Sequence, residues 1–303
     1  MMLVIRGENM HKHIMVIINP VAGKGNGKQK LFILIEEIMK HQDIPTIFFT
    51  QYKYHAKKLI EQYAKDYDIV ICSGGDGTFH EVVSGCMKSI RSPLLCYIPS
   101  GTVNDFANTL RLSSDVKTTI QNLYHKQKFA CDIGQFNQQY FSYVAAFGAF
   151  TNVSYTTSQQ SKNIFGRAAY ILEGFLSLSS ITSYKMRIAY DQEILEDDFI
   201  FGAISNAKTI GGLAPYHIKH AELDDGLFEV MLIKSPQNPL DIQSIITALM
   251  KQEVHPHFMY FFKTAGLYIT SSDEVAWTLD GEDGGRHKEV LITNKNKAIT
   301  LLV

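Results

Sequence analysis

The first half of the chain alternates strand-like and helix-like segments four times, and this repeat limits the folds that the chain can adopt. The strand-like segments are continuous apolar runs such as Ile14–Asn19, which are typical of strands buried on both faces. Each run leads into a loop and then into residues with helical spacing of apolar side chains, as over 27–41. Repeated strand–loop–helix units predict a parallel sheet. The strands are expected over 14–19, 46–50, 68–72 and 94–98.

After residue 128 the pattern changes. Strand signals now follow one another, and helical spacing is found chiefly over Gly166–Ser180 and Leu240–Lys251. We therefore predict an N-terminal α/β domain with a parallel sheet over 14–128, a flexible tail over 1–13 and a C-terminal antiparallel β-sandwich over 129–303. No Pro/Gly/Ser linker marks the boundary, so we expect an active site in the cleft between closely packed domains. The second set of strands is expected over 129–134, 140–146, 185–190, 199–206, 227–234, 266–270, 275–279, 289–293 and 298–303.

Composition excludes several classes of protein. Lys and Arg total 29 and Asp and Glu total 30, so the chain lacks the basic excess of a non-specific nucleic-acid binder. The four cysteines, at 72, 86, 96 and 131, form no C-x-x-C pair, which argues against zinc and redox motifs. No apolar run reaches the ~18 residues of a spanning helix, and the N-terminus lacks the apolar segment of a signal peptide. We expect a cytoplasmic protein.

Three glycine-containing loops follow predicted strands, at Asn19–Gly23, Gly74–Thr78 and Ser100–Asp105. In a parallel sheet such loops lie at one edge, beside the carboxyl ends of the strands. Glycine lets a backbone approach a ligand closely, and the helix that follows favours an anion at its N-terminus. The loops together predict a phosphate-binding site. Because Asp76 and Asp105 would repel phosphates unless a cation intervened, the site also implies Mg²⁺.

The segment Gly74–Glu81 (GGDGTFHE) resembles the signature of the diacylglycerol kinase catalytic-domain superfamily. That superfamily includes bacterial soluble diacylglycerol kinases, related bacterial lipid kinases, and sphingosine and ceramide kinases. Other segments resemble further motifs of the family in order and approximate spacing, so that the similarity spans about residues 14–303. These segments are Asn19–Gly23, Thr50 with His55–Ala56, Pro99–Phe106, Asp224–Phe228 and Leu279–Glu282.

The resemblance implies a two-domain, ATP-dependent lipid kinase whose nucleotide lies in the cleft between the domains. The implied nucleotide contacts come from the loops that follow the strands of the first domain. They are Asn19, Pro20, Val21, Ala22, Gly23, Thr50, Gly74, Gly75, Asp76, Gly77, Thr78, Phe79, His80, Gly101, Thr102, Asn104 and Asp105.

The resemblance also implies a structural Mg²⁺ in the second domain. Asp225 would bind it, and the backbone carbonyls of Glu222 and Leu227 would complete the site. Two positions depart from the commonest family pattern. His80 stands where bacterial members often have Asn, and we expect it to form hydrogen bonds or cap a helix. Asn108 stands where Arg is frequent, which would weaken a phosphate contact.

Three carboxylates are candidates for catalysis. By resemblance, Glu282 would accept the proton from the lipid hydroxyl. Phosphoryl transfer needs positioning, charge neutralisation and a proton acceptor, and Asp76 is suited to hold Mg²⁺ because its loop should face the phosphates. Asp76 and Asp280 stay open as alternative bases. Asp-Gly at 280–281 is also a leading signal for a hairpin turn without any chemistry.

Two apolar segments raise the question of lipid contact. Phe165–Ile181 has helical spacing with Lys162 and Arg167 near its start, which suits an anionic membrane surface. Packing on the sheet of the second domain is the preferred interpretation of this segment. The aromatic segment His257–Phe262 is interpreted chiefly as core packing, with a wall that binds a lipid chain as the alternative.

We predict transfer of the γ-phosphoryl group of ATP to a lipid hydroxyl, with diacylglycerol as the leading acceptor and phosphatidic acid as the product. The alternatives are another lipid of the sphingoid, phosphatidylglycerol or polyprenol type, a soluble acceptor as in NAD kinase, and a non-enzymatic nucleotide-binding regulatory protein. The expected partner is a lipid at the membrane surface, reached by peripheral association from the cytoplasm. Nucleic acid is not expected as a partner, and a homodimer stays open.

Overall fold

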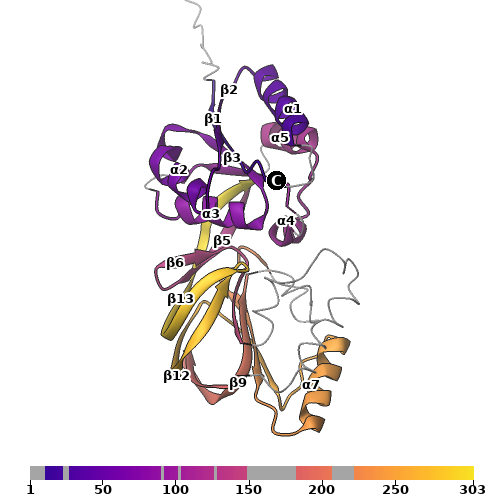
Figure 1. Ribbon diagram of the computed structural model, residues 1–303, viewed down its shortest axis with the longest axis vertical. Helices are drawn as coiled ribbons and strands as arrows, with labels where there is room; N and C mark the ends of the chain where they lie inside the picture. Colours follow the sequence, from indigo (N-terminus) through magenta and orange to yellow (C-terminus); the bar gives the residue numbers. More distant parts are fainter. Residues whose placement is uncertain are drawn as a thin grey trace, which may run out of the picture. The chain divides into compact units, whose positions relative to one another are not determined.

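The computed structural model describes residues 11–22, 27–89, 92–101, 104–125, 128–148, 182–206 and 222–303. It contains both helices and strands, with more residues in strands (Figure 1). The chain forms two compact units. Unit 1 comprises Met1–Phe129 and Ile299–Val303, and unit 2 comprises Ala130–Ala298.

Unit 1 is built on a parallel sheet, as the sequence predicts. Its strand order is β13–β4–β3–β1–β2, and each described pairing is parallel. The bounds are His13–Ile18 for β1, Ile44–Phe49 for β2, Ile69–Gly74 for β3, Leu94–Pro99 for β4 and Glu282–Leu302 for β13.

The end of the chain corrects the predicted domain assignment. Thr300 and Leu301 of β13 pair with Leu94 and Leu95 of β4, whereas the sequence assigned 298–303 to the second domain. Ile299 and Leu301 are buried because they complete the edge of this parallel sheet.

Helices cover both faces of this sheet (Figure 1). Helices α1 (Gly27–Lys40) and α5 (Val116–His125) place Leu34, Ile38 and Ile120 against buried strand residues. Figure 1 shows α2 (His55–Tyr63) and α3 (Asp76–Cys86) together on the opposite side. A short 3₁₀ turn, Ala64–Asp66, follows α2. None of the helices in the described part of the chain combines the length and apolar character needed to cross a bilayer.

Two expectations for unit 1 need correction. The helical region expected up to residue 126 is two helices, α4 (Asp105–Leu110) and α5, because Arg111 turns into the left-handed conformation. The flexible tail predicted over 1–13 does not extend to residues 12 and 13, whose amides are hydrogen-bonded to the rest of unit 1. The amide of Lys12 donates to Asp43 Oδ1 at 2.8 Å, and the amide of His13 donates to Asp68 Oδ2 at 3.1 Å.

Unit 2 consists mainly of antiparallel strands, in agreement with the sequence. The strand order is β11–β10–β9–β7–β12–β13, with β8 between β9 and β12 and with β5 joining β13 to β6. The bounds are Lys128–Phe136 for β5, Gln139–Phe141 for β6, Val144–Gly148 for β7, Tyr184–Tyr190 for β8, Glu193–Ser205 for β9, Phe228–Lys234 for β10, Met259–Thr264 for β11 and Gly266–Leu279 for β12.

Strands β7 and β8 share one position in the sheet, because each pairs with β9 on one side and with β12 on the other. Gly148 at the end of β7 lies opposite Phe201 of β9, and Tyr184 at the start of β8 lies opposite Phe199. Both strands run in the same direction along β9, although residues 149–183 separate them in the sequence. Gly148 has φ +87°, and a Cβ there would come within 2.1 Å of the Ile200 carbonyl oxygen. Glycine is therefore required where β7 ends.

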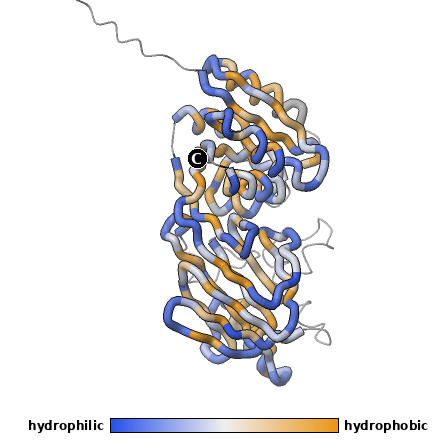
Figure 2. The backbone as a smooth tube through the Cα atoms, turned by 90° about the vertical axis from the view of Figure 1, so that its left-hand side faces the viewer, coloured by the Kyte–Doolittle hydropathy of each residue, from blue (hydrophilic) through white to orange (hydrophobic). Residues whose placement is uncertain are grey.

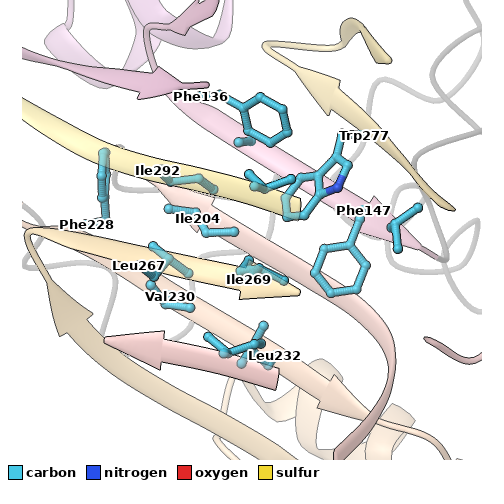
Figure 3. Close-up of a cluster of buried hydrophobic side chains, with 14 of the residues drawn as sticks. Phe136, Phe147, Ile204, Phe228, Val230, Leu232, Leu267, Ile269, Trp277 and Ile292 are labelled. Atoms are coloured by element: carbon cyan, nitrogen blue, oxygen red, sulfur yellow. The ribbon is translucent and has the colours of Figure 1, made fainter. Parts of the chain in front are cut away.

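The antiparallel sheet folds over one hydrophobic core. Figure 3 shows the Trp277 indole between Phe136 and Phe147, with ring centroids 5.0 and 4.9 Å away. Phe141 of β6 stacks on Phe228 of β10 at 5.6 Å, although these strands are far apart in the strand order. Because inward-facing residues from both ends of the order share this core, the predicted sandwich is one continuous sheet that curves onto itself.

A second cluster lies on the outer face of β9 and β10. Helix α7 (Pro239–Lys251) packs Ile245 and Leu249 there, with Met231 among the strand residues. The aromatic segment at 257–262 continues this packing as strand β11, whose Tyr260 and Phe262 reach the inner core. This confirms core packing for the segment, and Phe165–Ile181 lies outside the described residues. Figure 2 shows the hydrophobic stretches along the strands of both units.

Asp132 on β5 connects separate parts of unit 2. Its side chain is fully buried, and Oδ1 accepts hydrogen bonds from Asn296 Nδ2 at 3.1 Å and the Lys297 amide at 2.7 Å. Oδ2 accepts from the Gly226 amide at 2.6 Å. One carboxylate thus fixes the loop before β10 and the turn within β13.

We predict that Asp132→Asn destabilises unit 2 by about 2 kcal/mol or more, because an amide nitrogen would face a backbone donor and leave it unsatisfied. Unfolding in urea, followed by the fluorescence of Trp277, measures this change, since Trp277 is the only tryptophan and lies in the core of unit 2. The exposed Asp273→Asn is the matched control. Equal unfolding midpoints for the two variants would contradict the role given to Asp132.

Candidate functional site

The loops after β1, β3 and β4 meet at the carboxyl edge of the unit 1 sheet. The Asn19 amide donates to the Ser73 carbonyl at 2.9 Å, and Asn19 Nδ2 donates to Thr78 Oγ1 at 3.0 Å. Asn19 Oδ1 in turn accepts from the Val21 amide at 3.1 Å. The first loop is therefore tied to the second through one asparagine side chain.

The second and third loops are in direct backbone contact. A Cβ built on Gly101 would lie 2.7 Å from Gly75 Cα, and the Ser100 amide donates to the Gly74 carbonyl at 2.7 Å. Asn104, with φ +55°, closes the third loop: its Oδ1 accepts from the Gly101 amide and its Nδ2 donates to the Gly101 carbonyl, both at 2.9 Å. These glycines are required for the approach of the loops to one another, a reason that the sequence did not reveal.

Asp76 stands at the start of α3 and reaches the start of α4. Its Oδ2 accepts from the Asp105 amide at 3.1 Å, and its Oδ1 accepts from the Phe106 amide at 3.4 Å. The first-turn amides of a helix have no acceptor within the helix, and they favour negative charge. Asp76 therefore fixes α4 relative to α3, and the adjoining amides at the start of α3 suit a phosphate.

The remaining predicted nucleotide contacts differ in their surroundings. Phe79 is buried and stacks on Tyr97 at 4.4 Å and on Phe106 at 4.6 Å, so its side chain belongs to the core. Burial, reinforced by the nearby charge of Asp76, raises the pKa of Tyr97. Val21 is 86% exposed. The other positions fall into two groups: Pro20, Ala22, Gly74, Gly75, Gly77, Thr78, His80, Gly101, Asn104 and Asp105 lie on or beside these loops, and Gly23 and Thr102 lie outside the described residues.

Thr50 follows β2 at the same edge of the sheet. Its amide donates to the Ile18 carbonyl at 2.9 Å, which places it beside the end of β1. The short loop that follows brings the Tyr52 and His55 rings together at 4.4 Å, and α2 begins at His55. The two halves of the predicted Thr50 and His55–Ala56 element thus lie at the two ends of one loop.

The cysteines have no role at this edge of the sheet. Cys72, Cys86, Cys96 and Cys131 are free and buried, as expected for core thiols. Burial raises the pKa of Cys86 and of Cys96 to about 12, so these thiols are poor nucleophiles.

In unit 2, Asp280 and Gly281 form the two-residue turn of the β12–β13 hairpin, with φ of 52° and 80°. The Asp280 carboxylate is nearly buried and accepts backbone hydrogen bonds from Ser142 at 2.6 Å, Tyr143 at 2.9 Å and Val144 at 3.1 Å. These amides also end the single strand expected over 140–146, which becomes β6 and β7. The geometry gives Asp280 a positioning role, and it places the half-buried Glu282 directly after the turn.

The predicted metal loop at 222–227 is held close to a lysine. Asp225 Oδ1 accepts from the Leu227 amide at 2.9 Å, and Asp225 Oδ2 lies 3.3 Å from Lys263 Nζ. Lys263 Nζ also lies 2.9 Å from Oε1 of the buried Glu229, an ion pair without aligned hydrogen-bond geometry. Burial raises the pKa of Glu229, and the charge of Lys263 opposes this rise. For Lys263, burial lowers the pKa, but hydrogen bonding and charge interaction with Glu229 and Asp225 outweigh burial, so that its pKa is raised.

The carboxylates of Asp225 and Glu229 face one ammonium, that of Lys263. The three side chains therefore have an excess of negative charge, which a divalent cation would neutralise. Within the described ranges, no cluster of three or more His, Cys, Asp or Glu side chains could hold a metal. A metal at this loop would therefore depend on the Asp225 carboxylate with the backbone carbonyls of Glu222 and Leu227, which is the donor set that the sequence predicted.

Sequence reasoning missed the residues that position these groups. Asp132 and Lys263 hold the Asp225 loop, and Glu81 holds the loop after Thr50. Asp132 had a recognisable signal, since it is a lone carboxylate within the apolar strand segment Phe129–Gly134. Lys263 had none, because its partners are distant in sequence.

Comparison with known proteins identifies the family. The family described as "Diacylglycerol kinase catalytic domain" matches residues 13–136. The diacylglycerol kinase of Staphylococcus haemolyticus (strain JCSC1435) is 32% identical over 280 residues, which cover 91% of this chain and 84% of that protein. The diacylglycerol kinase of Staphylococcus epidermidis (strain ATCC 35984) is 31% identical over 283 residues, covering 91% of this chain and 88% of its own length.

Solved structures agree in fold. A crystal structure of a diacylglycerol kinase from Bacillus anthracis str. Sterne has a TM-score of 0.74 at 21% identity, covering 97% of this chain and 98% of its own. Another crystal structure from the same organism has a TM-score of 0.81 at 23% identity, covering 96% of each chain. With relatives above 30% identity along most of its length, the chain belongs to the diacylglycerol kinase family of enzymes.

Proposed function

We propose that this protein transfers the γ-phosphoryl group of ATP to the hydroxyl of diacylglycerol, forming phosphatidic acid. The observation that carries the proposal is the set of loops joined through Asn19, Gly75 and Gly101 at one edge of a parallel sheet. Such an edge places backbone amides of several loops and of a helix start around one point, as phosphate binding requires. The names of the family and of the relatives supply the acceptor.

Unit 1 supplies the nucleotide site in this proposal. The loops at Asn19–Gly23, Gly74–Thr78 and Ser100–Asp105, with Thr50 beside them, hold the phosphates through backbone amides. The Asp76 carboxylate lies at the start of α3, beside the amides that would hold the phosphates, and it would hold Mg²⁺ directly or through water. When bound, Mg²⁺ neutralises the charge that develops on the phosphoryl oxygens.

Unit 2 supplies the proton acceptor. The acceptor hydroxyl attacks the γ-phosphorus, the bond from phosphorus to the departing ADP oxygen breaks, and the hydroxyl proton passes to the Glu282 carboxylate. Asp280 fixes the hairpin that carries Glu282, since its own oxygens are engaged by three amides. These contacts support Glu282 ahead of Asp280 as the proposed base.

A structural Mg²⁺ at the Asp225 loop is part of the proposal. The Asp225 carboxylate and the carbonyls of Glu222 and Leu227 would hold it, while Lys263 balances the buried charge of Glu229. Its contribution would be to the stability of the loop.

The acceptor resides in a bilayer, so we propose peripheral association with the cytoplasmic face of the membrane. The interface is the lipid itself, and no nucleic-acid partner is invoked. A homodimer stays a prediction from the sequence.

The test of the proposed function is phosphoryl transfer in vitro. With Mg²⁺, γ-labelled ATP and detergent-dispersed diacylglycerol, we expect label in the organic phase that co-migrates with phosphatidic acid. Label in another lipid would replace the acceptor, and label only in the aqueous phase would favour a soluble acceptor. ATP binding without transfer to any acceptor would favour a regulatory nucleotide-binding protein.

We expect Glu282→Gln and Asp76→Asn each to reduce kcat by about 10²-fold or more, because one removes the proton acceptor and the other removes charge at the phosphates. Exposed Glu274→Gln and Asp66→Asn are the matched controls and should transfer at the wild-type rate. Full activity in both site variants would refute these assignments.

Asp280→Asn should lower both stability and kcat, which distinguishes positioning from proton transfer. The variant leaves at least one of the Ser142, Tyr143 and Val144 amides without an acceptor, at a cost of about 1–3 kcal/mol. Urea unfolding followed by Trp277 fluorescence measures the loss. Glu282→Gln should unfold like the wild type, and an Asp280→Asn protein of wild-type stability would contradict the positioning role.

Removal of metal should act at two places. EDTA is expected to abolish transfer, and Mg²⁺ is expected to restore it. EDTA should also lower the midpoint of thermal unfolding of the wild-type protein if the Asp225 loop binds Mg²⁺. Asp225→Asn should make the midpoint insensitive to EDTA. A wild-type midpoint that EDTA leaves unchanged would rule out the structural metal.

A further inference from the structure

Glu81 is the last residue of the segment that identified the family, and the nucleotide contacts do not include it. It lies on α3, one turn after Gly77 and Thr78. Its Oε1 accepts from the Tyr54 amide at 2.7 Å, and its Oε2 accepts from the Ala56 amide at 3.0 Å. Both oxygens of one carboxylate thus bind the backbone at the start of the neighbouring helix α2.

This contact replaces the usual cap of α2. Tyr54 occupies the N-cap position, and its side chain caps nothing. Tyr54 also has φ +67°, a conformation that a residue with a Cβ rarely adopts without support. Glu81 supplies both the missing acceptor and the support, from a different helix.

The loop between Thr50 and α2 is therefore held at both ends. At one end the Thr50 amide binds the Ile18 carbonyl of β1. At the other end Glu81 binds the amides on either side of His55. Within the loop, the Gln51 amide donates to His55 Nδ1 at 3.1 Å. This hydrogen bond links the start of the loop to the ring of His55, the residue between the two whose amides Glu81 binds.

We propose that Glu81 is a positioning residue for the nucleotide, which sets the Thr50 loop at a fixed distance from the first turn of α3. The inference rests on the proposed function, because it assumes that Thr50 and the α3 turn hold one ligand. Helix α3 carries Asp76 and Thr78 at its start and Glu81 one turn later. A nucleotide that contacts both Thr50 and the start of α3 therefore requires the Thr50 loop at the position that Glu81 sets. A carboxylate is needed because it accepts at two atoms, whereas the Gln amide accepts at only one.

The test compares Glu81→Gln with the exposed Glu61→Gln on α2, which changes the same charge without touching the loop. Three quantities are measured: the Kd for a fluorescent ATP analogue, the KM values for ATP and for dispersed diacylglycerol, and the exchange rates of the Tyr54 and Ala56 amides. For Glu81→Gln we expect nucleotide affinity to fall by about tenfold or more, with an unchanged KM for diacylglycerol and faster exchange at the amides. Glu61→Gln should match the wild type throughout.

Two results would overturn the inference. Unchanged exchange of the Tyr54 and Ala56 amides in Glu81→Gln would show that the Glu81 hydrogen bonds do not hold the loop. Faster exchange together with a wild-type Kd for the nucleotide would show that the loop is not part of the nucleotide site. Glu81→Asp provides a second variant that keeps the charge and shortens the reach, and it should also weaken nucleotide binding. If neither variant yields folded protein by circular dichroism, Glu81 serves folding and the positioning role is refuted.

Failure of the proposed function gives a different result. A wild-type protein that binds no ATP analogue would refute the nucleotide site, and the role of Glu81 with it. A wild-type protein that binds the analogue beside a Glu81→Gln variant of equal affinity would refute only the role of Glu81.

Discussion

The backbone contact between Gly75 and Gly101 is the constraint on which the arrangement of the loops at the carboxyl edge of the unit 1 sheet depends. A Cβ at Gly101 would lie 2.7 Å from Gly75 Cα, so the loops after β3 and β4 would have to move apart, whereas a Cβ at Gly75 would make a less severe contact of 3.2 Å with Gly101 Cα. The same two loops carry the hydrogen bonds from the Asp105 and Phe106 amides to the Asp76 carboxylate, so a movement of the loops would strain these contacts. The close approach of these two loops therefore favours glycine at Gly75 and Gly101 before any ligand is considered.

Acidic side chains that accept backbone amides organise both units. Asp76, Glu81, Asp132 and Asp280 each accept hydrogen bonds from two or more main-chain amides, and each joins segments that are distant in sequence. A carboxylate used in this way fixes a loop without the bulk of a hydrophobic contact. Within the Gly74–Glu81 segment, one carboxylate, Asp76, is proposed to serve chemistry, whereas another, Glu81, binds the amides of Tyr54 and Ala56.

The sequence was sufficient for the parallel sheet, the antiparallel unit and the loops that share one edge, because periodicity and glycine spacing are local signals. It was insufficient where a partner is remote. The pairing of Thr300 with Leu94 could not be predicted, since an apolar strand carries no mark of which sheet it joins. Asp280 was correctly expected as a hairpin turn, yet its amide partners lie about 140 residues away and only the fold reveals them. The roles of the nucleotide and metal residues remain predictions.

The shared position of β7 and β8 in the sheet has a consequence for how such a protein can diversify. Gly148 and Tyr184 face Phe201 and Phe199, which are near neighbours on the same strand. A segment that departs from a sheet and rejoins it at almost the same place can be lengthened, shortened or replaced while the registers of β9 and β12 stay fixed. A change in the length of the connection between Gly148 and Tyr184 would therefore leave the pairing of β7 and β8 with β9 and β12 in place.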